Sequence, residues 1–330
     1  MKLGVILPFQ QPRWTKRCVD EMLETARVAQ EAGFEVIEIG QHYLAEPYSF
    51  LQTTPTMARV AAEVPGMELR AMYLMPLNHP MELAENVATL DILTDGHISV
   101  GAILGYREIE NRGFGFPASE RFGRFMEGFT ILRQLLRHEE VNFVGKHYRI
   151  EGIRMTVPTV QQPHPPLLIG GNVDPAVIRA ARIGDGWVVS TRATTTTLAG
   201  QATLYRSALA EAGKSSNIVV FREAFVADTH ERAIEACRPF LGAKYESVAR
   251  WGHQNVLPAT DNLAVPFDQL VRNRFIIGNP EECGRQLLWY RDELGAACVS
   301  IRCQWPGIDF KTGLESIRRF GRDVLPWIKS

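Results

Sequence analysis

The chemically versatile residues of this chain of 330 residues follow the ends of short apolar runs. His42 is the strongest candidate for proton transfer, because an imidazole can gain or lose a proton near neutral pH. It stands in Gly40-Gln41-His42-Tyr43, directly after an apolar run. A hydrogen-bonded histidine with only a structural role is the competing interpretation.

A glycine pair suggests a second kind of site. Gly170-Gly171-Asn172-Val173 ends another apolar run, and Asp174-Pro175 follows at the expected start of a helix. Two glycines let the backbone approach a ligand closely, and the N–H groups of a helix start attract anions. A phosphate site is therefore one interpretation of this turn. The alternative is a tight strand-to-helix turn in which Asp174 caps its own helix.

Other side chains near these runs have simpler interpretations. Arg121 and Glu127 bracket the start of a predicted helix and are expected to form an ion pair. His79, before Pro80, is expected to cap the next helix or orient a loop. Tyr43 and Trp305 could wall a pocket for a planar ring, although aromatic residues in barrel proteins more often belong to the core.

The elements that position these residues alternate along the chain. Strands are predicted at Lys2–Leu7, Glu35–Ile39, Leu69–Met75, His97–Ile103, Pro166–Ile169, Gly186–Ser190, Ile218–Ala227 and Cys298–Arg302. Segments with helical spacing separate them, so the strands should be parallel with right-handed crossovers. Eight such units can close into a ring. We therefore predict an α/β fold, a (β/α)8 TIM barrel with insertions, forming a single domain over residues 1–330.

Two segments interrupt the alternation. Val141–Ile150 is expected to form a β-hairpin that turns at Gly145-Lys146. After the seventh strand, a long excursion from Gly242 to Arg274 combines turn residues with weak periodicity. We interpret it either as a mobile lid over the site or as a partly helical surface segment without a catalytic role.

Charge and composition exclude several classes of protein. The 36 Lys and Arg residues nearly balance the 37 Asp and Glu residues, so nucleic acid and membrane surfaces are not expected partners. The five cysteines show no Cys-x-x-Cys spacing, which favours buried thiols over a zinc site, and we expect no metal. Without an apparent signal peptide, the expected location is cytoplasmic.

The order of several motifs resembles the bacterial luciferase-like flavin monooxygenases over nearly the whole chain. The motifs are Ile39-Gly40-Gln41-His42-Tyr43, Pro76-Leu77-Asn78-His79-Pro80, Leu90 to His97, Gly101 to Arg107, Gln162 to Pro166, Gly170-Gly171 and Asp323 to Pro326. The family usually has arginine where His97 stands. Its luminous members have a cysteine where this chain has Ile103, so the resemblance does not extend to luminescence.

The resemblance implies an enzyme that uses reduced FMN (FMNH2), supplied by a separate reductase, and dioxygen to oxygenate a small organic substrate. It implies His42 as the catalytic residue and a homodimer as the assembly. The implied cofactor-binding residues are Ala71, Met72, Gly105, Tyr106, Arg107, Gly170, Gly171, Asn172 and Val173, with a non-prolyl cis peptide at Ala71-Met72. Tyr43 and Trp305 would line the substrate pocket.

Three rival functions remain open. A hydride-transfer oxidoreductase dependent on coenzyme F420 would use the same scaffold and the same glycine turn. A metal-dependent barrel hydrolase would need a His-x-His pair after the first strand, where this chain has Phe9-Gln10-Gln11. A flavin-binding relative without catalytic activity is the third.

Overall fold

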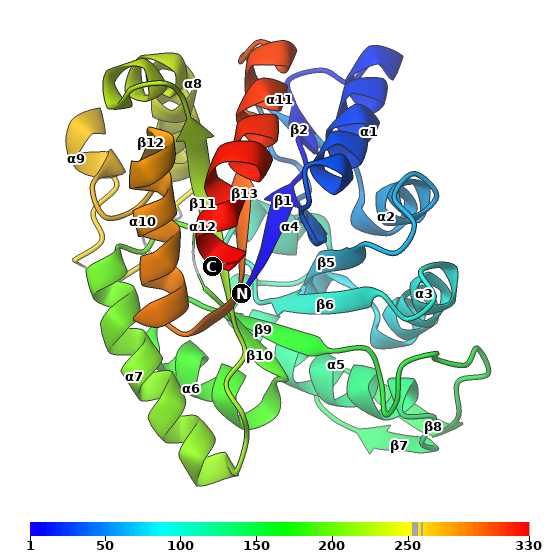
Figure 1. Ribbon diagram of the computed structural model, residues 1–330. Coiled ribbons are helices and arrows are strands. Elements are labelled where there is room, and N and C mark those ends of the chain that lie inside the picture. The colour runs from blue at the N-terminus through cyan, green and yellow to red at the C-terminus, as the bar shows by residue number, and fades with distance from the viewer. Residues whose placement is uncertain (190, 253–256, 259, 330) are drawn as a thin grey trace.

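A closed ring of eight parallel strands forms the centre of the molecule (Figure 1). The computed structural model describes residues 1–329 except 190, 253–256 and 259. The ring consists of β1 (Lys2–Ile6), β3 (Val36–Ile39), β5 (Glu68–Leu74), β6 (Ile98–Ile103), β9 (Leu167–Gly171), β10 (Gly186–Val189), β11 (Ile218–Val226) and β13 (Ala296–Arg302). Neighbours pair in the order β10-β9-β6-β5-β3-β1-β13-β11, and β10 pairs with β11 to close the ring. The predicted TIM barrel is confirmed.

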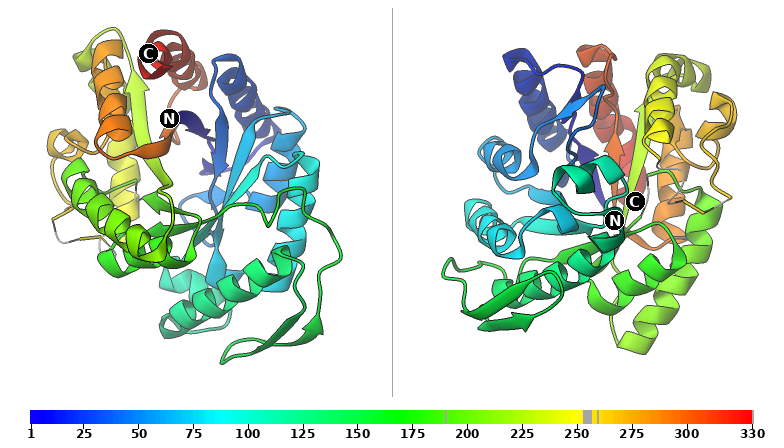
Figure 2. Two further views of the ribbon diagram at one scale, coloured as in Figure 1. Left: turned by 60° about the horizontal axis from the view of Figure 1, so that its bottom comes forward. Right: turned by 180° about the vertical axis from the view of Figure 1, so that it is seen from behind.

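Helices cover the outside of the ring (Figures 1 and 2). They are α1 (Lys16–Glu31), α2 (Thr53–Ala61), α3 (Pro80–Leu93), α5 (Arg121–Leu136), α6 (Asp174–Ile183), α7 (Thr195–Ala212), α8 (His230–Arg250), α10 (Pro280–Asp292) and α11 (Phe310–Arg319). A π-helical segment (Phe320–Val324) and α12 (Leu325–Lys329) continue α11. In α1, Met22, Leu23, Ala26 and Ala29 lie on one face of the helix and are buried against the barrel.

The inside of the ring holds both apolar and charged side chains. Val36, Met72, Leu168, Val188, Val219 and Cys298 form one buried apolar cluster there. Gly101 makes room for this packing, because a Cβ atom on it would lie 1.9 Å from Met72 Sδ. Glu38 and Arg70 form a buried ion pair, and Ser300 Oγ donates a hydrogen bond of 2.5 Å to Glu38 Oε1. The runs of apolar residues gave no sign of this pair.

The chain also forms several short strands and helices in addition to the eight-stranded ring. The predicted hairpin is confirmed as the antiparallel pair β7 (Val141–Val144) and β8 (Arg149–Ile153). Sequence patterns did not reveal β2 (Gln10–Gln11), β4 (Ser49–Phe50), α4 (Glu108–Gly113), α9 (Phe267–Val271) or β12 (Ile276–Gly278), nor the 3-10 turns at Met75–Leu77 and Ala118–Glu120. Their shortness explains why periodicity did not detect them.

The excursion after β11 is more helical than its composition suggested. Helix α8 continues past Gly242 to Arg250, so the first part of the excursion is helical, in agreement with the partly helical interpretation. Little in the sequence indicated this continuation, because proline and glycine usually break helices, yet Pro239 and Gly242 both lie inside α8. Residues 253–256 and 259 of the predicted lid lie outside the described residues.

A second hydrophobic core holds this excursion above the barrel. It is separate from the main core around the strands, and its buried members come from β11, α8, α9, β12 and the segments next to them. They are Phe225, Ala233, Cys237, Leu241, Tyr245, Val248, Leu257, Leu263, Leu270, Phe275, Ile277 and Trp305. Strand β11 is nine residues long, so its last residues extend far enough to pair with β12.

No helix in the described part of the chain is both long and apolar enough to cross a membrane.

Candidate active site

A cavity of about 430 Å³ opens at the carboxyl ends of the barrel strands. This is the end at which TIM barrels place their active sites. Among the residues predicted for the site, those that line the cavity are His42, Met72, Gly105, Tyr106, Gly170, Asn172 and Val173. The fold therefore brings the proton-transfer candidate and the glycine turn into one space.

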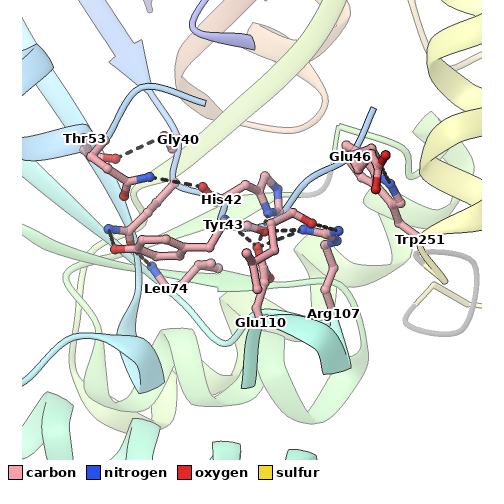
Figure 3. A network of polar contacts seen from close by, with 12 residues as sticks. Gly40, His42, Tyr43, Glu46, Thr53, Leu74, Arg107, Glu110 and Trp251 are labelled. Carbon is pink, nitrogen blue, oxygen red and sulfur yellow. Dashed lines mark hydrogen bonds and ion pairs between the residues drawn. The ribbon is translucent and has the colours of Figure 1, made fainter. Parts of the chain in front are cut away.

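His42 is held by a buried carboxylate from α4 (Figure 3). Its Nδ1 lies 2.9 Å from Glu110 Oε1, so the imidazole donates there and leaves Nε2 for other partners. Glu110 is only 1% exposed, whereas His42 is 22% exposed and lines the cavity. A buried carboxylate therefore orients a histidine that a ligand in the cavity can reach.

Glu110 also organises the loop that carries His42. The same Oε1 accepts hydrogen bonds from Tyr43 N at 2.9 Å and from Arg107 Nη1 at 3.3 Å. Arg107 in turn donates to the carbonyl oxygens of Tyr43 and Leu44, at 2.6 and 2.8 Å. Arg107 thus holds the loop that follows β3, and does not itself line the cavity.

Aromatic rings surround the His42 imidazole. Its ring centroid lies 5.1 Å from Phe50, 6.0 Å from Tyr106 and 6.1 Å from Trp251. Trp251 follows α8, and its Nε1 donates to Glu46 O at 3.0 Å (Figure 3). These rings limit the access of water to the imidazole.

The turn after β9 leaves a helix start without a side-chain cap. Val173 is the N-cap of α6, and its side chain makes no capping hydrogen bond. Asp174 is the first residue of α6, so the alternative prediction that it caps this helix was wrong. A Cβ atom on Gly171 would lie 2.9 Å from the carbonyl carbon of Ala176, so glycine lets β9 and α6 approach each other.

Two arginines stand beside this turn. Arg121 and Arg179 both line the cavity, and within the described residues neither forms an ion pair. Arg179 Nε is buried without a hydrogen-bond partner, and burial lowers the pKa of this guanidinium. The Arg179 guanidinium lies over the rings of Phe122 and Phe125, at 5.2 and 5.4 Å from their centroids. A partly buried guanidinium without an ion-pair partner would be stabilised by an anion. We call residues 170–173, Arg121 and Arg179 the anion corner.

The predicted ion pair between Arg121 and Glu127 was wrong. Glu127 instead accepts hydrogen bonds from the backbone N–H groups of Lys146 and His147, both at 2.9 Å, and so holds the β7–β8 hairpin. These bonds, with a third from Tyr148 N, outweigh burial and lower the pKa of Glu127. This leaves Arg121 available to the cavity.

A third group of charges lies on the side of the cavity formed by β11, α8 and β13. Lys244 Nζ is bonded to Glu223 Oε1, and Trp305 Nε1 donates to Glu223 Oε2 at 2.6 Å. Burial lowers the pKa of Lys244 to about 7. Burial alone would raise the pKa of Glu223, but Lys244 and Arg302 outweigh it and lower that pKa.

Some residues predicted for the site lie behind the cavity wall. Ala71, Arg107, Gly171, Tyr43 and Trp305 are not among the lining residues. Ala71 is fully buried in the main core, because alternate side chains of a strand point to opposite faces.

The two aromatic residues predicted for the substrate pocket also have structural partners. The Tyr43 ring packs against Phe114, and Trp305 belongs to the second core. The predicted cis bond at Ala71-Met72 was wrong, because the cis bonds among the described residues are Glu46-Pro47 and Gln162-Pro163.

Sequence reasoning missed Glu110, Arg179, Lys244, Trp251 and Arg302. Glu110 lies three residues after Arg107, which is the spacing of neighbours on a helix, but α4 was not predicted. Within the described residues, no group of three or more His, Cys, Asp or Glu side chains could hold a metal ion.

Solved structures with the same fold cover nearly the whole chain. A monooxygenase from Streptomyces bottropensis, RslO1, superimposes with a TM-score of 0.85 at 24% identity, covering 99% of each chain. The oxygenating constituent of 3,6-diketocamphane monooxygenase from Pseudomonas putida, a type II Baeyer-Villiger enzyme solved with FMN, has a TM-score of 0.82 at 17% identity, covering 99% of this chain and 98% of its own.

An F420-dependent secondary alcohol dehydrogenase, solved with an F420-acetone adduct, has a TM-score of 0.81 at 16% identity, covering 100% of this chain and 99% of its own. At such low identities, these likenesses show the fold. The family model for luciferase-like monooxygenases matches residues 1–297. The chain therefore belongs to the luciferase-like monooxygenase family and is an enzyme.

Proposed function

We propose that this enzyme is a flavin-dependent monooxygenase that uses reduced FMN and dioxygen to oxygenate a small organic substrate. The observation that carries the proposal is that one cavity contains both an anion corner with uncompensated guanidinium groups and a histidine oriented by a buried carboxylate. A cofactor with a phosphate at one end and a reactive ring at the other would use both.

Each part of the cavity would have a separate task. The anion corner would bind the phosphate through the start of α6 and through Arg121 and Arg179. Bound reduced FMN would supply the electrons that activate dioxygen. His42 would move a proton between the reacting atoms and its ring nitrogen, and Glu110 would hold the imidazole in place.

A comparison of reduced FMN with reduced riboflavin, which lacks the phosphate, tests the anion corner. The affinities would be measured by anaerobic titration of wild type, Arg121→Met and Arg179→Met. A hydrogen bond to a charged group contributes about 1.5–3 kcal/mol, so each variant should weaken FMN binding by about 10- to 150-fold. Riboflavin binding should change little.

Arg182→Met is the matched control, because Arg182 lies on the same helix, is 61% exposed and contacts Glu211. It should bind FMN like wild type. Equal affinity of wild type for FMN and riboflavin would contradict a phosphate site at this corner. Oxygen consumption with reduced FMN and a panel of organic substrates then tests for monooxygenase activity.

Coenzyme F420 is the alternative cofactor, since it also has a phosphate and one structural neighbour was solved with an F420 adduct. The same anaerobic titration with reduced F420 separates the two. Tighter binding of F420, with hydride transfer and no oxygen consumption, would replace the monooxygenase proposal with an F420-dependent oxidoreductase.

Three parts of the proposal rest on the family resemblance. A separate reductase would supply the reduced flavin, two copies of the chain would form a homodimer, and the excursion at residues 242–274 would close as a lid. Sedimentation of the purified protein tests the dimer. Activity measured with and without an added flavin reductase tests the need for a separate reductase.

A further inference from the structure

The cavity contains a second set of cationic side chains, apart from the anion corner. Arg302 at the end of β13, Lys244 on α8 and Arg192 after β10 all line it. Arg302 Nε is buried without a hydrogen-bond partner, and within the described residues no carboxylate lies within ion-pair distance of this guanidinium. The guanidinium lies over the ring of Phe9, 5.3 Å from its centroid.

Neither nearby carboxylate is bonded to Arg302. Glu223 is in register with Arg302 on the neighbouring strand, but its two oxygens are bonded to Lys244 and Trp305. Glu38 also lines the cavity; its Oε1 is bonded to Arg70 and Ser300, and its Oε2 is buried without a hydrogen-bond partner. Among the described residues, Arg302 is therefore a cation without a bonded counter-ion.

The order of the strands separates this group from the anion corner. Around the closed ring, β13 lies four strands from β6, which precedes Arg121, and three strands from β9, which precedes Arg179. Arg302 and the anion corner therefore stand on different sides of the barrel mouth. A phosphate bound at the anion corner would therefore leave Arg302 without a bonded counter-ion.

The surroundings of Arg302 limit what can bind there. Phe9, Phe50, Phe221 and Val248 contribute apolar surface to the same cavity. A molecule with a large apolar part and one anionic group could pack against these rings and form an ion pair with Arg302. A planar carboxylate suits a guanidinium, because two parallel hydrogen bonds can form between them.

We propose that Arg302, supported by Lys244, forms a subsite for the carboxylate of an organic substrate with an apolar body. The inference rests on the proposed function, because it assigns the anion corner to the phosphate of the cofactor. It narrows the substrate from any small organic molecule to a carboxylic acid.

A matched pair of ligands tests the subsite. The dissociation constants of 3-phenylpropanoate and its neutral amide would be measured by calorimetry under anaerobic conditions, with saturating reduced FMN. Wild type should bind the acid at least about ten-fold more tightly than the amide, as expected for a hydrogen bond to a charged group. Arg302→Met should lose that preference and keep its affinity for the amide.

Two further variants test whether the preference for the acid depends on the guanidinium of Arg302. Arg302→Lys keeps the charge but lacks the planar guanidinium with its parallel N–H donors. It should therefore keep part of the preference for the acid that Arg302→Met loses. Arg318→Met is the control for a lost positive charge, because Arg318 lies on α11 and is 48% exposed, and it should behave like wild type.

The outcomes that overturn the inference are distinct from failure of the proposed function. Equal binding of acid and amide by wild type overturns the subsite, even if Arg302→Met does not fold. A loss of FMN affinity in Arg302→Met, as large as the loss for the acid, would place Arg302 at the cofactor instead. If neither reduced cofactor binds, the proposed function fails, and the same titrations without cofactor still test Arg302.

For the titrations without cofactor, Arg179→Met separates the two anion sites. A preference for the acid that disappears in Arg179→Met and persists in Arg302→Met would also overturn the inference. The opposite pattern would support it.

Discussion

Replacing Glu110 by glutamine is the most informative perturbation of the His42 site. Glu110 Oε1 interacts with three donors: His42 Nδ1 and Tyr43 N at 2.9 Å, and Arg107 Nη1 at 3.3 Å. Glutamine keeps the shape and one acceptor oxygen but removes the charge. The bond to the imidazole then changes from charge-assisted to neutral, while Arg107 keeps its two carbonyl partners.

The size of the effect follows from these contacts. Loss of a charged hydrogen-bond partner costs about 2–3 kcal/mol, and each 1.36 kcal/mol is a factor of ten in rate. Glu110→Gln should therefore lower turnover by about 30- to 150-fold. The same change should reduce the free energy of unfolding by about 1–3 kcal/mol, because Arg107 loses its only carboxylate partner among the described residues.

The assay is substrate-dependent oxygen consumption with reduced FMN. Glu108→Gln, an exposed neighbour on α4, is the control and should resemble wild type. A Glu110→Gln enzyme with wild-type turnover would refute the role of Glu110 in orienting His42.

Other perturbations test separate features. His42→Ala should leave flavin binding largely intact and lower turnover by about 10²- to 10⁴-fold, and normal turnover would remove His42 from the mechanism. Burial lowers the pKa of Lys244 from 10.5 to about 7, so between these values the unfolded chain binds more protons than the folded one. The free energy of unfolding, measured with urea at pH 7 and 9.5, should therefore rise more between these pH values for wild type than for Lys244→Met. Gly171→Ala should cost about 1–3 kcal/mol, because its Cβ would crowd the Ala176 backbone, whereas Gly200→Ala meets nothing within 4 Å and should not destabilise α7.

The barrel could be predicted because its strands and helices repeat strong local patterns. All eight strands of the ring were expected within a few residues of their observed bounds. The prediction that His79 caps a helix was also confirmed, since its Nδ1 accepts from Met81 N. These features depend on neighbours in sequence.

The candidate site depends on contacts between distant segments, which a single sequence does not encode in its periodicity. His42 and Glu110 are 68 positions apart, and Lys244 and Glu223 are 21 apart. Arg121 illustrates the limit, because its predicted partner Glu127 instead accepts hydrogen bonds from the β7–β8 hairpin, where Lys146 lies 19 positions further along the chain. The roles proposed for His42 and the glycine turn remain predictions.

The second hydrophobic core has a consequence for how related enzymes could diverge. Residues that hold one wall of the cavity, including Tyr245, Val248 and Trp305, pack mainly among themselves and not with the core around the strands. Mutations in that layer can reshape the wall beside Lys244 while the anion corner, supported from β9 and α6, keeps its framework. One wall of the cavity can thus diverge between relatives while the opposite corner of the barrel mouth keeps its geometry.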